Sequence, residues 1–279
     1  MQLLSALAAV HASYILHRDL KQTNLLLDKR GVLKLCDFGL ARRHCAGPGK
    51  SSTPNVTSLW YRAPEILLGD TSYGTAVDIW SCGCILAEWL QLGEPLMQGT
   101  GELDQLNTIF RLLGTPTDHS WPTFSALPAN AMLKFPLVDN VTISLGADGQ
   151  IVKLPKSALR KKFPADGWTP SVAYVAATHK TTALSEAGYE LLSGFLTCDP
   201  ANRLSAAAAL RHAWFSESPL PVPLSPAEIR QLSTNREEAI ASGAHTQALA
   251  QQRAAVARQF ASEQAAQIAA QLKMRAGWF

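Results

Sequence analysis

The sequence predicts a mainly α-helical fold with a small β-hairpin region. Apolar residues recur at helical spacing over residues 1–13, 75–90 and 101–113. Two short apolar runs, at 25–27 and 32–35, flank a turn that ends in Gly31. Such a pattern is typical of a hairpin, because glycine accepts the positive φ that a tight turn requires.

Composition limits the classes of protein to consider. The chain has 279 residues, 47% hydrophobic and 17% charged, and no apolar run long enough to span a bilayer. Its first residues lack a basic region and a cleavage site, so no signal peptide is expected. A net charge of +3 does not favour nucleic acid as a partner. The cysteines are odd in number and lack metal-ligand spacing, which predicts reduced thiols in an intracellular protein: Cys36, Cys45, Cys82, Cys84 and Cys198.

The helices are predicted one by one from their apolar spacing. The first carries Leu3, Leu4 and Leu7 on one face. Residues 75–90 are apolar nearly all round, which predicts a buried helix. The helix at 101–113 is closed by Gly114, with Pro116 beyond it. Later helices are predicted after Ser185, as an N-cap, and over 206–213.

The domain organisation is predicted from shifts in composition. Residues 1–218 are expected to form one domain, with insertions at about 137–158 and 164–183 and an added hairpin over 141–151. A Pro-rich linker, 219–226, precedes a stretch rich in Ala, Gln, Arg and Glu. Residues 219–279 are therefore expected to be linker and a helical or disordered tail.

The chemistry concentrates in residues 17–39. Asp19, Lys21 and Asn24 lie within six residues, and Asp37 follows thirteen residues after Asn24. The predicted hairpin between Asn24 and Asp37 would bring these two side chains close in space. Phosphoryl transfer needs a carboxylate to orient a hydroxyl, oxygen ligands for Mg²⁺ and a cation near the moving phosphoryl group. These residues could supply all of them.

The spacing of His17-Arg18-Asp19-Leu20-xxx-Asn24 and Asp37-Phe38-Gly39 resembles the catalytic-loop signature of the eukaryotic protein kinases. Further on, the sequences WYRAPE at 60–65 and DPANRLS at 199–205 resemble other kinase motifs. The chain is most similar to the cyclin-dependent subgroup, and within it to the PITSLRE-type branch. The resemblance covers about 1–135 and 184–221.

The resemblance implies roles for individual residues. Asp19 would be the base, Lys21 the charge stabiliser, and Ser58 the hydroxyl that links them. ATP and Mg²⁺ are the implied cofactors. Asn24 and Asp37 would hold Mg²⁺, while Leu26 would form the floor under adenine and Cys36 would line its pocket. Support of the site would come from Asp78, which accepts hydrogen bonds from the loop, and from an ion pair between Glu65 and Arg203.

The activation segment between residues 39 and 63 carries the remaining implied sites. Thr53 lies where the family takes an activating phosphate, although Thr53-Pro54 could simply be a loop turn. Arg18 and Arg42 would bind that phosphate. Val56 and Arg62 would receive a Ser/Thr-Pro protein substrate. A cyclin is the implied partner, and the nucleus the implied location.

A Gly-rich loop, a lysine in a VAIK context and its glutamate partner are not found in the sequence. We therefore expect the fold to be the kinase C-terminal lobe only, with the N-terminal lobe absent. The alternative to an active kinase is then a catalytically dead fragment that acts as a binding module. On this expectation ATP binding is weak and turnover very low.

Overall fold

The computed structural model describes residues 1–44, 58–91, 93–129, 141–145, 151–155, 157–165, 184–218, 225, 227–228 and 230. The chain divides into two compact units, Met1–Asp28 with Val32–Val222, and Lys29–Gly31 with Pro223–Phe279. All elements described below lie in the first unit. The predictions for Thr53, Val56 and most of residues 219–279 lie outside the described residues.

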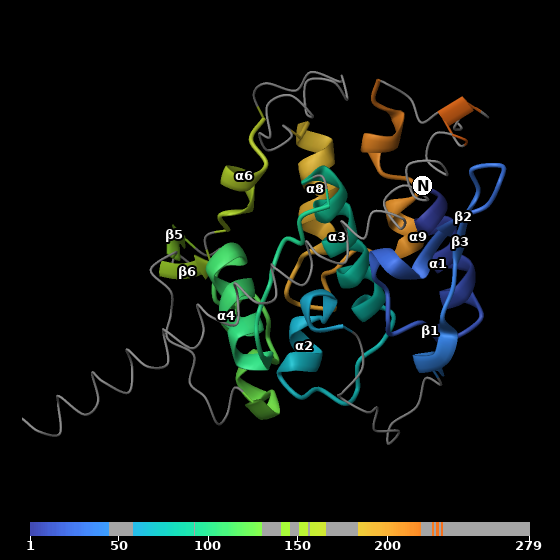
Figure 1. Ribbon diagram of the computed structural model, residues 1–279. Coiled ribbons are helices and arrows are strands. Elements are labelled where there is room, and N and C mark those ends of the chain that lie inside the picture. The colour runs from blue at the N-terminus through green and yellow to red at the C-terminus, as the bar shows by residue number, and fades with distance from the viewer. Residues whose placement is uncertain are drawn as a thin grey trace, which may run out of the picture. The chain divides into compact units, whose positions relative to one another are not determined.

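The helix α3 (Ala76–Leu90) runs through the core of the first unit (Figure 1). It buries side chains on every side, as its apolar sequence predicts. The helix α8 (Glu186–Phe195) packs against it. A Cβ atom on Gly83 would lie 2.7 Å from the Cβ of Phe195, so glycine permits this close approach.

The helix α1 (Gln2–Ala12) leads into the segment that carries the site. Its apolar face is buried through Leu3, Leu4 and Leu7. The strands β2 (Leu25–Leu27) and β3 (Leu33–Leu35) form an antiparallel ribbon in which Leu25 pairs with Leu35. Gly31 takes a φ of 74° in the turn between them. The start of β2, just after Asn24, and the end of β3, just before Cys36, therefore lie side by side.

Two further ribbons lie in the described residues. The strands β1 (Ile15–Leu16) and β4 (Arg42–Arg43) pair antiparallel, with Leu16 opposite Arg42. The strands β5 (Val141–Leu145) and β6 (Ile151–Pro155) form a third ribbon where an added hairpin was predicted. Of these two ribbons, only the β1–β4 pairing was not predicted. The β1–β4 pairing joins residues 26 positions apart, and no local sequence pattern signals it.

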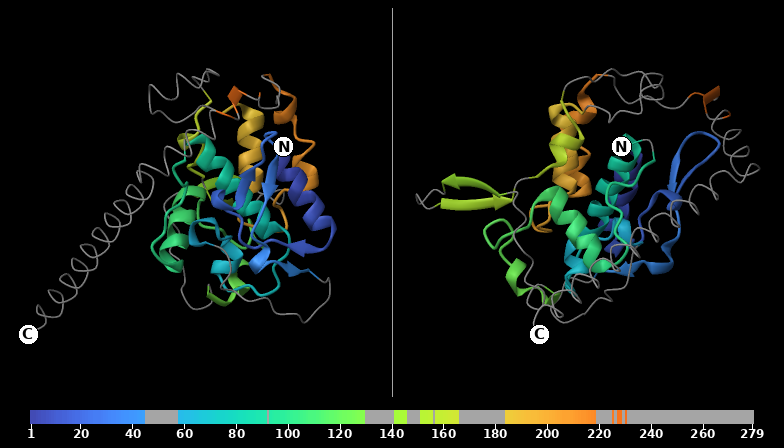
Figure 2. Two further views of the ribbon diagram at one scale, coloured as in Figure 1. Left: turned by 45° about the vertical axis from the view of Figure 1, so that its right-hand side comes forward. Right: turned by 60° about the vertical axis from the view of Figure 1, so that its left-hand side comes forward.

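The remaining elements complete the unit (Figure 2). Ser185 accepts a hydrogen bond from the backbone N–H of Gly188 and so caps α8. The helix predicted over 206–213 is shorter: it ends at Ala209, and a 3₁₀ turn covers Ala213–Ser216. The other elements are η1 (Gln22–Asn24), η2 (Phe38–Leu40), η3 (Leu59–Tyr61), α2 (Pro64–Leu67), α4 (Glu102–Leu113), η4 (Phe124–Ala126), α6 (Leu159–Lys162), α9 (Ala206–Ala209) and η5 (Ala213–Ser216).

Within the described ranges, no helix has the length and apolar character needed to cross a membrane. The described cysteines, Cys36, Cys82, Cys84 and Cys198, are free thiols.

Candidate active site

Asp19 is the centre of a hydrogen-bonded cluster built from two segments, residues 19–24 and Ser58. Its Oδ2 accepts from Lys21 Nζ at 2.8 Å and from Asn24 Nδ2 at 3.3 Å. Its Oδ1 accepts from the backbone N–H of Ser58 at 3.1 Å. The hydroxyl of Ser58 lies 3.4 Å from the same Oδ1 and accepts from Lys21 Nζ at 3.2 Å. The structure thus brings together one carboxylate, one ammonium, one amide and one hydroxyl.

The surroundings of Asp19 favour its ionised form. Burial alone would raise the pKa of its carboxyl group. The hydrogen bond from Lys21, the positive charge of that lysine, and the donors of Ser58 and Asn24 outweigh burial and lower the pKa below its ordinary value. Asp19 is therefore a carboxylate at neutral pH, ready to accept a proton.

Asn24 and Asp37 are joined through the β2–β3 ribbon. Asn24 donates from Nδ2 to the backbone oxygen of Asp19 at 2.8 Å, which leaves its amide oxygen as the group for a cation. The backbone oxygen of Asn24 accepts from the N–H of Cys36 at 3.0 Å, so Asp37 follows directly after this contact. Asp37 is held at a φ of 63°, and its Oδ1 accepts from Gly39 N–H at 3.4 Å.

These two residues fit a magnesium ion by the chemistry of their donors. Both offer hard oxygen atoms, and Mg²⁺ in nucleotide sites is usually held by one or two side chains together with phosphate oxygens and water. Among the residues that the structure describes, no cluster of three or more His, Cys, Asp and Glu side chains could hold a metal alone. A site completed by phosphate oxygens agrees with both observations.

The loop that carries Asp19 is anchored on the core helix α3. Asp78, in the first turn of α3, is fully buried. Its Oδ2 accepts from the backbone N–H of His17 at 2.9 Å, and its Oδ1 from that of Arg18 at 2.8 Å. His17 in turn lies 3.0 Å, through Nε2, from the backbone oxygen of Cys36. The loop and the ribbon are thereby fixed to one helix.

A second anchor holds the segment after Ser58. Arg203 donates from Nη1 and Nη2 to the two carboxylate oxygens of Glu65, at 2.7 and 2.9 Å. Both side chains have 0% exposure. Arg203 also donates to the backbone oxygens of Ala76, Thr197 and Cys198. This ion pair is completely buried and has its polar atoms satisfied.

Arg18 and Arg42, which the resemblance predicts to bind a phosphate, are connected through the β1–β4 ribbon. Arg18 donates from Nε to the backbone oxygen of Leu40 and from Nη1 to the hydroxyl of Tyr73. Arg42, on β4, pairs with Leu16, on β1. Leu16 lies two residues before Arg18 in the sequence. Thr53 lies outside the described residues. The roles of these residues stay a prediction.

Arg62 has a partner that the sequence did not reveal. Its Nη1 lies 2.5 Å from Glu102 Oε1, in the first turn of α4. Glu102 lies 40 positions further along the chain, and its only advance signal is an acidic residue at a helix N-terminus. Tyr73 and His17 were likewise missed as partners in the site. Val56, the other predicted substrate residue, lies outside the described residues.

Of the predicted adenine contacts, Leu26 lies on β2 and Cys36 directly follows β3. Leu26 is 42% exposed, and the Cys36 thiol donates to the backbone oxygen of Asn24 at 3.3 Å.

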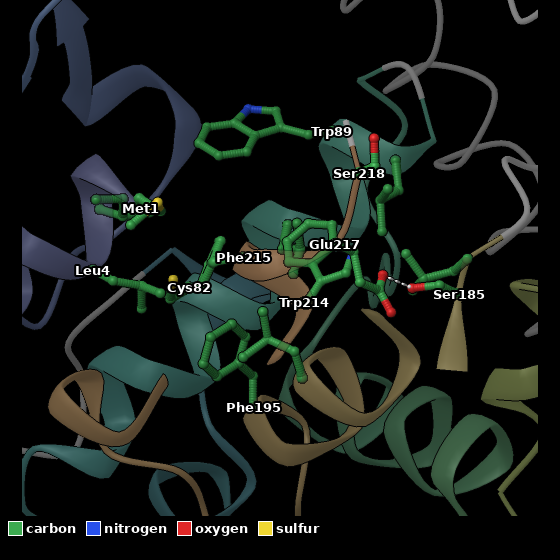
Figure 3. A pocket seen from close by; sticks show the side chains of 15 residues that line it. Met1, Leu4, Cys82, Trp89, Ser185, Phe195, Trp214, Phe215, Glu217 and Ser218 are labelled. Carbon is green, nitrogen blue, oxygen red and sulfur yellow. Dashed lines mark hydrogen bonds between the residues drawn. The ribbon is translucent and has the colours of Figure 1, made fainter. Parts of the chain in front are cut away.

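A cavity of about 730 Å³ lies elsewhere, between the start of α1, the end of α3, α8 and η5. Its walls are mostly apolar, and Glu217 accepts from Ser185 at one side (Figure 3). Burial raises the pKa of the Cys82 thiol in its wall to about 12, so this cysteine stays protonated.

Comparison with known proteins assigns the class. Residues 1–215 match the family model described as the protein kinase domain, and the chain therefore belongs to the protein kinase family. It is similar to proteins that are named as cyclin-dependent kinases or as a serine/threonine-protein kinase. It is 47% identical over 221 residues to Cyclin-dependent kinase G-2 of Oryza sativa subsp. indica, covering 79% of this chain and 27% of the relative.

Two animal proteins and one solved structure are similar to the chain as well. It is 47% identical to the Serine/threonine-protein kinase PITSLRE of Drosophila melanogaster, over 79% of this chain and 20% of that protein. It is 43% identical to Cyclin-dependent kinase 11B of Homo sapiens, over 80% of this chain and 24% of that protein. A chain in the crystal structure of the yeast RNA Pol II CTD kinase CTDK-1 complex matches with a TM-score of 0.61 and 36% identity. That match covers 80% of this chain and 62% of the solved chain.

These findings correct the predicted fold class. The expectation of a C-terminal lobe only is wrong, because the match to the kinase domain begins at residue 1 and extends to 215. That expectation depended on motifs not found in the sequence, and the absence of a motif does not identify the domain to which the other residues belong. The chain spans between a fifth and a third of the length of the curated relatives reported above.

Proposed function

We propose that the chain transfers the γ-phosphoryl group of ATP to serine or threonine hydroxyls of proteins. One observation carries the proposal: the carboxylate of Asp19 accepts hydrogen bonds from Lys21, Asn24 and Ser58 in one cluster. Phosphoryl transfer demands little covalent chemistry of a protein and depends on positioning and charge. This cluster offers both.

In the proposed reaction, the oxygen of the substrate hydroxyl forms a bond to the γ-phosphorus of ATP. Asp19 accepts the proton that this hydroxyl loses. The bond from that phosphorus to the bridging oxygen breaks, and ADP leaves with the electron pair. Lys21, held 2.8 Å from Asp19, offsets negative charge on the group in transfer. Asn24 and Asp37 would hold Mg²⁺, which neutralises phosphate charge when bound. Leu26 and Cys36 would contact adenine.

The substrate class proposed is Ser/Thr followed by proline, with Arg62 and Val56 at the substrate side. Phosphate on Thr53 would bind Arg18 and Arg42 and order the segment before Ser58. A cyclin is the proposed partner, in keeping with the names of the relatives. We also propose an intracellular location, the nucleus rather than the cytoplasm, on the resemblance alone.

The test is phosphorylation of a Ser-Pro peptide by the purified 279-residue chain, with ATP and Mg²⁺. Asp19→Asn removes the proton acceptor but keeps the shape, and should lower kcat by about 10²–10⁴-fold. Asp118→Asn, an exposed aspartate, is the matched control and should leave the rate unchanged. Equal rates for the Asp19 variant and the unsubstituted chain would refute the proposal.

A second candidate is a binding module without turnover. The observation in its favour is a set of exposed large apolar side chains on and beside the β2–β3 ribbon, Leu26, Leu27, Val32, Phe38 and Leu40, which are 37–53% exposed. Exposed apolar side chains in one region mark sites where another molecule binds. No incorporation of phosphate by the unsubstituted chain, together with retained binding of a cyclin, would favour this candidate.

A further inference from the structure

The cavity of about 730 Å³ in the first unit shares no residue with the Asp19 cluster. Four elements contribute to its walls, among them through Leu4 of α1, Leu86 of α3, Leu191 of α8 and Phe215 of η5. Its volume is within the range of about 300–1,000 Å³ that small-molecule sites occupy. Such sites are mostly apolar and fix the ligand through a small number of polar groups. The cavity therefore has the size and the walls of a ligand site.

The carboxylate and hydroxyl groups of the lining lie on one side of the cavity. Glu217 and Ser185 are neighbours there, and the hydroxyl of Ser185 donates to a carboxylate oxygen of Glu217 at 2.6 Å (Figure 3). Ser218, the next residue of the chain, also lines the cavity. Among the ion pairs of the described residues, none involves Glu217. The wall therefore carries a negative charge that no cation of these residues offsets.

Aromatic rings accompany this carboxylate. Trp214 and Phe215 lie just before Glu217 in the chain, and both line the cavity. The centroids of these two rings are 5.3 Å apart. Trp89, near the end of α3, lines the cavity as well and is 44% exposed, so its ring is in contact with solvent. The face of an aromatic ring attracts a cation, and tryptophan does so most strongly. A carboxylate among such rings suits a positively charged group on an apolar body.

Two other groups of the lining can ionise, the amino group of Met1 and the thiol of Cys82. Burial lowers the pKa of the Met1 amino group below its ordinary value, so this group carries less positive charge than an exposed amine. Burial also keeps the thiol neutral, because it raises the pKa of Cys82 to about 12. Met1 and Ser185 lie on opposite sides of the cavity (Figure 3). The charge that a ligand meets beside Glu217 is therefore negative.

We propose that this cavity binds a small amphiphilic cation. The alkyl or aryl body of the ligand lies against the leucine and phenylalanine side chains, and its ammonium group lies between Glu217 and Trp214. Removal of apolar surface from water drives the binding, and the carboxylate selects among ligands of equal length. The site is separate from the proposed phosphoryl transfer and does not depend on it.

The test uses three probes that share one decyl chain: decyltrimethylammonium, decanol and decanoate, each below its critical micelle concentration. Isothermal titration calorimetry with the full chain measures the Kd of each probe, and NMR of labelled leucine and methionine methyl groups locates it. Glu217→Gln removes the charge and keeps the shape of the side chain. Glu190→Gln is the matched control, because it removes the same charge from an exposed position of α8 outside the lining.

Decyltrimethylammonium should bind about tenfold more tightly than decanoate, with decanol between them. In Glu217→Gln this preference should shrink to about twofold or less, whereas Glu190→Gln should retain it. The methyl signals of Leu4 and Leu191 should shift on binding. Those of Leu106, which does not line the cavity, should stay in place.

Four results would each overturn the proposal: no saturable binding of decyltrimethylammonium, decanoate binding as tightly as the cation, a full preference retained in Glu217→Gln, or methyl shifts confined to residues outside the lining. None of these measurements requires turnover. A chain without kinase activity would refute the proposed function and leave the outcome at this cavity unaffected.

Discussion

Replacing Arg203 by methionine removes the guanidinium group that faces the fully buried Glu65. The glutamate carboxylate then loses two hydrogen bonds of 2.7 and 2.9 Å in a place without solvent. A buried charge left without its partner costs about 3–5 kcal/mol. Arg203 also donates to three backbone oxygens, and each carbonyl that stays buried without a donor adds roughly 1–3 kcal/mol.

The opposite substitution, Glu65→Gln, leaves those three carbonyl contacts in place. The cost should therefore be smaller for Glu65→Gln than for Arg203→Met, although both exceed about 2 kcal/mol. Since whole domains are stable by about 5–15 kcal/mol, Arg203→Met should bring the unit close to unfolding. Urea titration followed by circular dichroism measures the free energy of unfolding of each variant.

The exposed pair of Lys34 and Asp28, 3.9 Å apart, provides the control. Lys34→Met should change the free energy of unfolding by no more than about 1 kcal/mol. The reasoning is refuted if Arg203→Met lies within about 1 kcal/mol of the unsubstituted chain. It is also refuted if Glu65→Gln is the more costly of the two.

Three further predictions concern Glu88, Gly83 and Lys21. Burial raises the pKa of Glu88, so its contribution to stability is present at low pH and is lost as pH rises through that pKa. Thermal unfolding measured across mildly acidic to neutral pH should therefore depend less on pH for Glu88→Gln than for the unsubstituted chain. Gly83→Ala would place a Cβ 2.7 Å from a phenylalanine Cβ of α8 and should cost about 1–3 kcal/mol, whereas Gly74→Ala, with its nearest atoms at 3.6 Å, should cost less than about 1 kcal/mol in urea unfolding. Lys21→Met removes the hydrogen bond and the positive charge that lower the pKa of Asp19, while burial, which raises it, stays. The pKa of Asp19 should therefore rise, and the acid limb of the pH profile of kcat/KM should move to higher pH. An unmoved limb would contradict the role assigned to this lysine.

The parts of the site that could be predicted are those that are local in sequence. Asp19, Lys21 and Asn24 lie within six residues, and the ribbon that joins Asn24 to Asp37 is signalled by a turn with glycine. Short separations leave the chain few ways to arrange such residues. Ser58, 39 residues after Asp19, was predicted only because the motif resembles a known family.

The parts that could not be predicted depend on contacts between distant segments. Nothing in the spacing connects Arg62 with Glu102, or His11 with Asp78, whose carboxylate lies 2.9 Å from the His11 ring. The length of the last helix was also missed: α9 ends at Ala209, and a 3₁₀ turn over Ala213–Ser216 follows it. The fold class failed for a different reason, since it was argued from motifs that were not found.

Asp78 shows why the local and the distant parts depend on each other. The reacting carboxylate must stay beside Lys21, yet the loop that carries it contains a residue at positive φ that would relax if it were released. A helix terminus provides the necessary hold, because a carboxylate in the first turn of α3 is favoured by the helix dipole and can face outward to the loop. Substitution at Asp78 should therefore affect Asp19 first. The free energy of unfolding, measured by urea titration, should fall as well, by roughly 1–3 kcal/mol for each buried donor left without an acceptor.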